Sequence, residues 1–523
     1  MSGPGTRTRR RAATVVVCLG LFLLGLDLTV LNVAVPELKQ DLSPTMAQVQ
    51  WIVAAYGLVL GGTVLSTGAL TDRIGRRRAY CSGLALCGVT SILGATGHDA
   101  GQVIAARGGM GAGAALLMPS TLSIITNLFP ETALRRRAIA LWAGIGSLGG
   151  LAGPVIGGWL VEQFSWHAAF WINVPVAATA ILLAWWLVPE SRAAAPEPVD
   201  VPGALLAAAG LLALVWGIIE GPGLGWTSPP VLAAFAAAAV LNSCFLLWQA
   251  RCPHPMLPLR FLRDLRISGS ALALSLMAFA LLGALFVLTL YLQGILGYTP
   301  QQAGIRTLPL AGALAAGAVT TLPLLARGGA KVPIVCGLAL VTAAFAVLAT
   351  TETGSGYPRI ALFQLIAGFG AGLIAAAGTE TVMATIPPDQ AGLGSAINDA
   401  TRQVGSTLGV AVQGSILATV YTTHLNADLA PHHLPPALLH TLTNTPPSSP
   451  EALHLAATPA AAHVLSAVRD SFTHAMTTTA LTAGTLAFTA TAVATYWLVR
   501  TRRVRPGHPS LTADAGQQYL APR

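Results

Sequence analysis

One aspartate lies in a stretch of sequence where a charged side chain is costly. Asp27 belongs to 26-LDLTVLNVAVP-36, the continuation of an apolar run that begins at Thr14. A carboxylate near the middle of a bilayer costs roughly 2.5–3.5 kcal/mol on insertion scales, so such acids usually serve ion pathways or proton relays. Asp27 is therefore the first candidate for a group that takes up and releases a proton.

Arg107 is its candidate partner. At 1.5 Å per residue, Asp27 lies about 13 Å from the end of its run near residue 36, and Arg107 about 8 Å from the start of its own run. These depths are compatible with contact between the two side chains. Two roles follow: a proton-loading acid with its arginine, or a permanent buried ion pair that fixes helix packing.

The composition defines the class of protein. Apolar residues make up 54% of the 523 residues, charged residues only 9%, and the mean hydropathy is +0.66. No soluble domain of this length has such a balance, which is typical of a polytopic membrane protein. Helices are favoured over a β-barrel because the apolar runs are long and continuous.

Counting runs of about 20 apolar residues gives an all-α membrane protein with fourteen spans. They are predicted near 14–35, 49–70, 79–97, 102–126, 137–160, 168–188, 202–220, 230–249, 268–291, 303–325, 332–350, 359–383, 395–419 and 475–499.

The basic residues predict the orientation. Most of the 29 Lys and Arg residues fall on segments that share one side if the N-terminus is cytoplasmic, such as the clusters 7–11, 73–78, 135–137 and 500–505. By the positive-inside rule both termini are then cytoplasmic. The net charge of +9 reflects this orientation and not nucleic-acid binding, because the cations flank spans and form no single patch.

An internal repeat divides the chain. At a constant offset of 259 residues, 109-GMGAG-113 matches 368-GFGAG-372, and Gly146 and Gly150 match Gly405 and Gly409. Two related six-helix halves of equal orientation are typical of a secondary transporter. The predicted parts are a tail (1–13), an N-terminal bundle (14–188), two inserted helices (189–260), a C-terminal bundle (261–500) with an outer loop (420–474), and a second cytoplasmic tail (501–523).

The outer loop is rich in histidine. It holds His424, His432, His433, His440, His454, His463 and His474. We interpret it as a solvated loop; a pH sensor or metal site is the alternative. Elsewhere the six cysteines predict neither a disulfide framework nor a metal site.

Several motifs together resemble one family. The stretches 26-LDLTVLNVAVP-36 and 68-GALTDRIGRRR-78, Arg107 with the glycines after it, and the glycine-rich stretch 149–158 are similar to the major facilitator superfamily, and more narrowly to its fourteen-span drug:proton antiporters. The similarity extends from about residue 14 to 500. The sequence departs from the family at His167, where arginine is usual, and at Met110, where glutamine is usual.

The resemblance assigns roles to two groups of residues. Gly68, Asp72, Arg73, Gly75 and Arg76 would form a cytoplasmic latch between helices, with the glycines permitting a tight reversal. Gly149, Gly153, Pro154, Gly157 and Gly158 in span five resemble the antiporter signature, and small residues there let a neighbouring helix approach closely.

Further polar and aromatic residues are candidates for substrate contact. Asn32, Tyr56, Phe286 and Gln293 offer stacking surfaces and hydrogen bonds to a drug-sized ligand. Glu380, Asp399 and Arg402, near the cytoplasmic ends of spans twelve and thirteen, would form a substrate or proton exit or a latch with Asp72 and Arg73; solvated side chains are the alternative.

The sequence excludes some functions and leaves two. Neither lysine lies in a nucleotide-binding P-loop, which excludes an ATP-driven pump, and an enzyme is not expected. The resemblance implies proton-coupled export of a hydrophobic drug or antibiotic by a monomer in the bacterial plasma membrane, with no cofactor besides the proton gradient. Uptake of a small metabolite, or a non-transporting sensor on the same fold, is the alternative.

Overall fold

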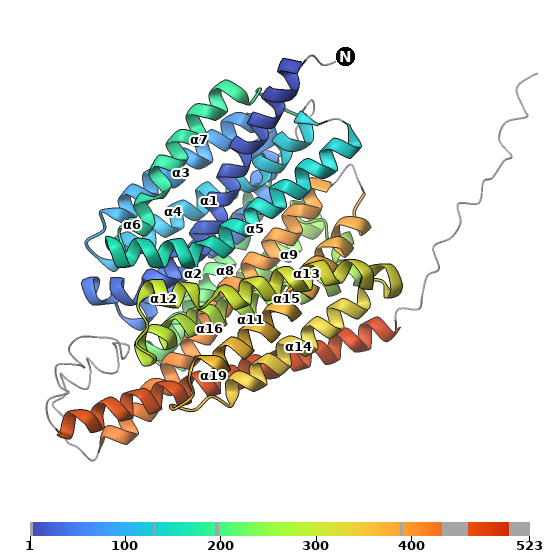
Figure 1. Cartoon of the computed structure of the whole chain (residues 1–523). Coiled ribbons are helices and arrows are strands. Elements are labelled where there is room, and N and C mark those ends of the chain that lie inside the picture. Colours follow the sequence, from blue (N-terminus) through green and yellow to red (C-terminus); the bar gives the residue numbers. More distant parts are fainter. Residues whose placement is uncertain (1–3, 130, 194–197, 388–390, 431–458, 501–523) are drawn as a thin grey trace, which may run out of the picture.

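The computed structural model describes the chain except residues 1–3, 130, 194–197, 388–390, 431–458 and 501–523. Within the described part every regular element is a helix, and the long helices lie side by side along a common direction (Figure 1). This agrees with the all-α prediction, because a helix satisfies its backbone hydrogen-bonding groups within one segment and can therefore cross lipid.

The described helices fall into three groups along the chain. The N-terminal half contains α1 (Pro4–Leu42), α2 (Met46–Ile74), α3 (Arg76–Ala95), α4 (Ala100–Leu128), α5 (Thr132–Gln163), α6 (Ala168–Trp171) and α7 (Asn173–Leu187). The insert contains α8 (Val201–Leu224) and α9 (Pro229–Arg251). The C-terminal half contains α10 (Leu259–Arg263), α11 (Leu265–Leu290), η1 (Tyr291–Ile295), α12 (Pro300–Ile305), α13 (Leu308–Gly328), α14 (Lys331–Ala349), α15 (Tyr357–Thr385), α16 (Ala391–Leu429) and α19 (Pro459–Arg500).

Twelve helical segments of the described chain are long and apolar enough to cross a membrane, against the fourteen predicted. The predicted spans near 79–97 and 475–499 correspond to α3 and α19, which are not among the twelve. Helix α3 has 20 residues and opens with three arginines, and the side chains of α19 after position 494 lie outside the described residues. A membrane-embedded helical fold follows from the twelve.

The two halves share one pattern of helix packing. In the N-terminal half α1 packs on α5 and α7, and α4 packs on α2 and α3. In the C-terminal half α11 packs on α16 and α19, and α15 packs on α13 and α14. The same pairs recur in the same chain order, which agrees with an internal repeat.

Glycines bring the corresponding pair of helices together in each half. In α5 the glycines that approach the backbone of α1 are Gly149, against Phe22, Gly153, against Leu26, and Gly157, against Val30. In α16 the glycines that approach the backbone of α11 are Gly405, against Ser275, and Gly409, against Phe279. Both sets are spaced four residues apart, which agrees with two related halves.

The predicted outer loop 420–474 is shorter than expected. Helix α16 continues to Leu429, and α19 already begins at Pro459. Both extensions bury an apolar stripe at helical spacing against one core cluster, formed by Tyr421, Leu425, Leu429, Val464, Val468 and Phe472. The abundance of polar residues concealed this stripe, whose period is that of an amphipathic helix.

The predicted histidine cluster is described only in part. His424 on α16 pairs with Asp428 at 3.0 Å, and its ring lies 4.6 Å from that of His474 on α19. The side chains of the other five histidines of the loop lie outside the described residues. Within the described chain no group of three or more His, Cys, Asp or Glu side chains is suited to hold a metal ion.

The two ends of the insert are joined to each other, and through Met256 to the N-terminal half, by Asp200, the residue before α8. Its carboxylate accepts hydrogen bonds from Gly203 N (2.9 Å), Trp248 Nε1 (2.8 Å), Gln249 Nε2 (2.7 Å) and Met256 N (3.3 Å). Met256 Sδ in turn accepts a hydrogen bond from Ser66 of α2. Burial acts to raise the pKa of Asp200, but the four hydrogen bonds outweigh it and hold the pKa below its ordinary value.

We expect Asp200→Ala to lower the free energy of unfolding by about 1–3 kcal/mol, because it leaves buried donors without an acceptor. The pKa of Asp200 is lower in the folded than in the unfolded state. Its contribution is therefore fully present above about pH 4 and is lost as the pH falls through the folded-state pKa. Unfolding of the purified protein and of Asp200→Ala in detergent at several pH values measures this contribution to the free energy of unfolding.

Asp264→Ala is the matched control, since Asp264 caps α11 from an exposed position. Asp264→Ala should lower the free energy of unfolding by less than Asp200→Ala does. A difference between Asp200→Ala and the unaltered protein that stays constant down to low pH contradicts the assignment.

Candidate functional site

Asp27 is fully buried in the middle of α1. One carboxylate oxygen, Oδ1, accepts a hydrogen bond of 2.6 Å from Asn173 Nδ2 at the start of α7. The other oxygen, Oδ2, is buried without a hydrogen-bond partner in the described structure. A buried carboxylate with one oxygen unsatisfied is costly in the ionised form, which is what a group that exchanges a proton requires.

Arg107 lies beside Asp27, as its depth predicted, but does not neutralise it. The guanidinium donates to two backbone carbonyls, Nε to Ile52 O at 3.2 Å and NH1 to Asp27 O at 3.3 Å. It also stacks over the ring of Tyr56, 4.6 Å from the centroid. No ion pair joins the Asp27 and Arg107 side chains in the described part of the chain. The permanent ion pair is therefore not the state observed.

Two residues of this cluster were not among the predicted ones. Asn173 is fully buried and donates to Asp27 and, at 2.9 Å, to Ser91 Oγ of α3. Ser91 Oγ then donates to Phe170 O at 3.1 Å. Asn173 is a polar side chain within the apolar stretch 170–177, and the sequence could have indicated it for the same reason as Asp27. What the sequence does not show is that α7 brings this amide to α1.

The predicted substrate residues do not converge on Asp27. Tyr56 belongs to the cluster through Arg107, whereas Asn32 is buried roughly 140° around α1 from Asp27. Phe286 lies in the core of the C-terminal half. Gln293 donates to Val33 O at 3.0 Å, which joins η1 to the outer part of α1. Phe286 and Gln293 therefore contact neighbouring helices elsewhere in the bundle.

The glycine-rich part of α5 serves two interfaces. Gly149, Gly153 and Gly157 face α1, where Thr29 Oγ1 donates to Gly150 O at 3.0 Å. Pro154 and Gly158 face the other half of the protein: a Cβ at Gly158 would lie 2.5 Å from Pro300 O, and the Pro154 carbonyl contacts Gly304 of α12. The close helix approach predicted for this segment is present on both faces.

The two halves meet at a second interface between α2 and α16. Ser415 donates to Gln50 Oε1 at 3.2 Å, and Gly57 lies against Thr407. Gln50 and Gly57 are in the first half of α2, whereas Thr407 lies near the middle of α16 and Ser415 in its later half. If the N-terminus is cytoplasmic, the contact of Gln50 with Ser415 and those of α5 with α12 lie toward the outer side.

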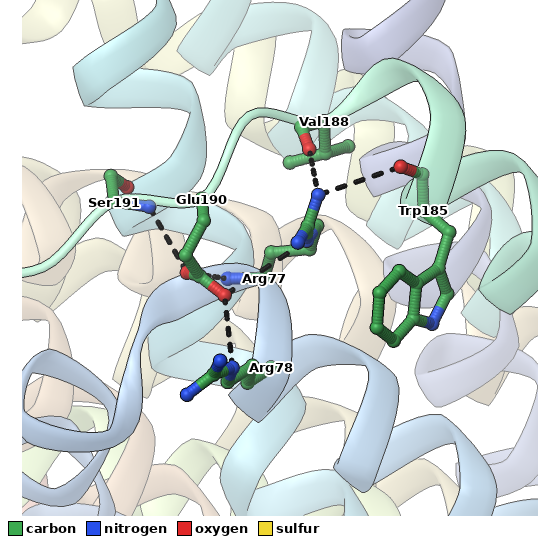
Figure 2. Close-up of polar contacts among 6 residues, drawn as sticks. All are labelled: Arg77, Arg78, Trp185, Val188, Glu190 and Ser191. Atoms are coloured by element: carbon green, nitrogen blue, oxygen red, sulfur yellow. Dashed lines mark hydrogen bonds and ion pairs between the residues drawn. The ribbon is translucent and has the colours of Figure 1, made fainter.

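The loop between α2 and α3 forms a network with the end of α7. Gly75 adopts φ 109°, a conformation that favours glycine, and Asp72 pairs with Arg76 at 2.8 Å. Glu190 accepts from Arg77 N at 3.1 Å and lies 3.9 and 3.8 Å from Arg77 and Arg78 Nε (Figure 2). Arg77 also donates to the carbonyls of Val188 and Trp185. The sequence predicted a latch here but missed Glu190.

The other members of the predicted latch play smaller parts. Arg73 is exposed, and Gly68 faces Pro119 of α4 with room to spare. In the C-terminal half Glu380 and Arg402 are exposed, whereas Asp399 is buried and accepts from Ser395 at 3.4 Å. Asp72 pairs with Arg76 and not with Arg402, so the predicted latch between the halves is not formed in this structure.

Two helical halves with one packing pattern and a buried acid in the first span are typical of a secondary transporter. The sequence matches the profile of the Major Facilitator Superfamily over residues 17–410, and the chain belongs to that family. The fold agrees: a bacterial homologue of the human lysosomal transporter Spinster, solved in an inward-facing and unoccupied conformation, superposes with a TM-score of 0.65 at 16% identity, covering 95% of this chain and 98% of the other.

The curated relatives are resistance and export proteins. The chain is 33% identical to the tetracenomycin C resistance and export protein of Streptomyces glaucescens, over 79% of this chain and 77% of the relative. It is 35% identical to the multidrug resistance protein Stp of Mycobacterium tuberculosis, over 79% and 76%. It is 34% identical to the multidrug efflux pump LfrA of Mycolicibacterium smegmatis, over 82% and 85%.

We expect Gly158→Val to open the α5–α12 interface, because its Cβ would contact backbone atoms of Pro300 and Gln301 that cannot move aside singly. The measurement is the rate of disulfide formation between cysteines introduced at Glu162 and Gln301, which the Gln301 N to Glu162 Oε2 hydrogen bond of 3.1 Å places together. The rate should fall several-fold. Gly144→Val on the same helix, where a Cβ meets nothing within 4 Å, is the control and should leave it unchanged.

We expect Glu190→Gln to lower the free energy of unfolding by about 1 kcal/mol, because the change keeps the size of the side chain and removes its charge. Thermal unfolding in detergent measures it. Glu131→Gln is the control: Glu131 pairs with Arg10 at 3.4 Å from a side chain that is 53% exposed, and such pairs contribute little. Equal effects of the two substitutions contradict the role given to Glu190.

Proposed function

We propose that the protein is a proton-coupled antiporter that exports a hydrophobic drug or antibiotic across the bacterial plasma membrane. The observation that carries the proposal is Asp27, a buried acid without an ion-pair partner at mid-depth in the first span. The names of the relatives support export, since they specify tetracenomycin C, methylenomycin A and puromycin resistance as well as multidrug efflux. Asp27 is nearly alone at its depth, which favours a narrow range of substrates.

The proposed topology has fourteen spans, with α3 and α19 added to the twelve segments that meet the criterion of length and hydropathy. Two observations support it. Helix α3 packs on α4 and α7, and α19 packs on α14 and α16, as spans of a bundle do. The start of α1 and the end of α19 also lie at the same end of the bundle (Figure 1), as an even number of spans requires. Both termini are then cytoplasmic, and the transporter acts as a monomer without a cofactor.

The transport cycle is alternating access. The contacts of Gln50 with Ser415 and of α5 with α12 lie toward the outer side in this topology, which supports a state closed to the outside. Protonation of Asp27 from the outside releases the drug and permits inward opening, and deprotonation inside restores affinity for the drug. One proton moving inward gains about 2.3 kcal/mol per 100 mV of membrane potential, to which the pH gradient adds, and this supports uphill export of a neutral compound.

We expect Asp27→Asn to abolish resistance. The measurement is the minimum inhibitory concentration of an antibiotic panel that includes puromycin and ethidium, in a pump-deficient bacterium that produces the protein at equal levels. The unaltered protein should raise the value several-fold for at least one compound, and Asp27→Asn should return it to the empty-vector value.

Asp99→Asn is the matched control, because Asp99 caps α4 from an exposed position and asparagine caps equally well. Full resistance in Asp27→Asn contradicts the role of Asp27 in coupling. A higher cellular accumulation of the test compound in producing cells points to uptake and contradicts export.

A further inference from the structure

The contact between Asp27 and Asn173 leaves two oxygens unsatisfied, one on each side chain. Asp27 Oδ2 and Asn173 Oδ1 are both buried, and neither has a hydrogen-bond partner in the described structure. Both side chains are 0% exposed, so their surroundings are protein on every side. Buried oxygens without donors are uncommon in native structures and need an explanation.

The neighbouring donors are already used. Asn173 has two N–H groups, and they go to Asp27 Oδ1 at 2.6 Å and to Ser91 Oγ at 2.9 Å. Ser91 gives its single hydrogen to Phe170 O at 3.1 Å. Because the serine hydrogen is used in this way, Ser91 Oγ can only accept from the amide, which fixes the orientation of Asn173. No hydrogen remains in this chain of bonds for the two oxygens.

The charged and titratable groups around Asp27 do not fill the gap. Among the described residues, those that interact with its carboxyl are Arg107 from α4, Tyr56 from α2 and Cys87 from α3. Arg107 donates to the carbonyls of Ile52 and Asp27, and not to the carboxylate. The Cys87 Sγ donates to Met110 O at 3.4 Å. From α5, the nearby contact to α1 is made by the Gly150 carbonyl, which is an acceptor.

A single proton on Asp27 supplies the missing donor. A carboxylic acid and a primary amide are complementary: the amide N–H donates to one carboxyl oxygen while the acid O–H donates to the amide oxygen, in one cyclic pair. Half of this pair is present as the bond from Asn173 Nδ2 to Asp27 Oδ1. The two unsatisfied oxygens are those that the second half would join.

We propose that Asn173 is the positioning residue that converts the protonation of Asp27 into a contact between α1 and α7. This rests on the proposed role of Asp27 in proton coupling. The proton comes from the outer solution, binds Asp27 Oδ2 and is shared in a hydrogen bond with Asn173 Oδ1. When the proton leaves, one hydrogen bond is lost and two buried oxygens are again without a donor.

The position of Asn173 makes this contact consequential for the helix. Asn173 is the first residue of α7, directly after the break that separates α7 from α6. Through Ser91 and the Phe170 carbonyl, the same amide is connected to α3 and to α6. A change in the protonation of Asp27 therefore affects contacts of α3, α6 and α7, close to the break between α6 and α7.

Infrared difference spectroscopy of the full-length protein in lipid nanodiscs, titrated from about pH 4 to about pH 9, tests the proposal without any substrate. The band of interest is the carboxylic C=O stretch that is absent in Asp27→Asn. In the unaltered protein we expect the frequency of a strongly hydrogen-bonded acid. In Asn173→Leu the band should move to the higher frequency of a free acid, because the acid O–H then has no amide oxygen to donate to.

Asn242→Leu is the matched control, since the amide of Asn242 on α9 donates only within its own helix, to Ala238 O. It should not move the band. Should Asn173→Leu fail to fold, the unaltered protein still decides: a band at the free-acid frequency overturns the proposal. A band in Asn173→Leu that stays at the frequency of the unaltered protein also overturns it, because the acid O–H would then donate to another group.

The outcomes separate this proposal from the proposed function. If no band assigned to Asp27 titrates, Asp27 exchanges no proton, and both fail. If Asp27 titrates but Asn173→Leu leaves the frequency of its band unchanged, the role of Asn173 fails and proton coupling by Asp27 stands.

Discussion

The proposed mechanism depends on the free-energy cost of an ionised carboxylate, that of Asp27, in the apolar interior of the protein without an opposite charge in contact with it. Asp27 is 0% exposed, and the guanidinium beside it is bonded to backbone carbonyls. A closed ion pair would hold the acid ionised, and full solvation would remove the cost of its charge. The arrangement avoids both, so the two protonation states of one side chain differ in the contacts they make with α7.

Much of this could be predicted from the sequence, because the bilayer imposes strong rules on composition. The all-helical fold, the burial of Asp27 and its proximity to Arg107 follow from apolar runs and from the rarity of charges within them. The predicted span boundaries were wrong where polar residues concealed an apolar stripe, as at Tyr421, Leu425 and Phe472.

What the sequence could not supply is which helices meet. Asn173 is 146 positions away from Asp27, and Glu190 is 113 positions away from the Arg77 amide it accepts from. Each is an ordinary polar residue until packing brings it to its partner. The side-chain types of Gln293 and Phe286 suit a ligand, and in this structure both also contact neighbouring helices.

The site lies close to the interface between the two halves. Thr29, two residues after Asp27, donates to the Gly150 carbonyl of α5, and one turn further Pro154 contacts Gly304 of α12 in the other half. Contiguity alone does not transmit a signal; it needs an element with two arrangements that both ends bias. Helix α5 is the element that joins the two ends, because Gly149 and Gly153 bring its backbone against α1 and Gly158 brings it against α12.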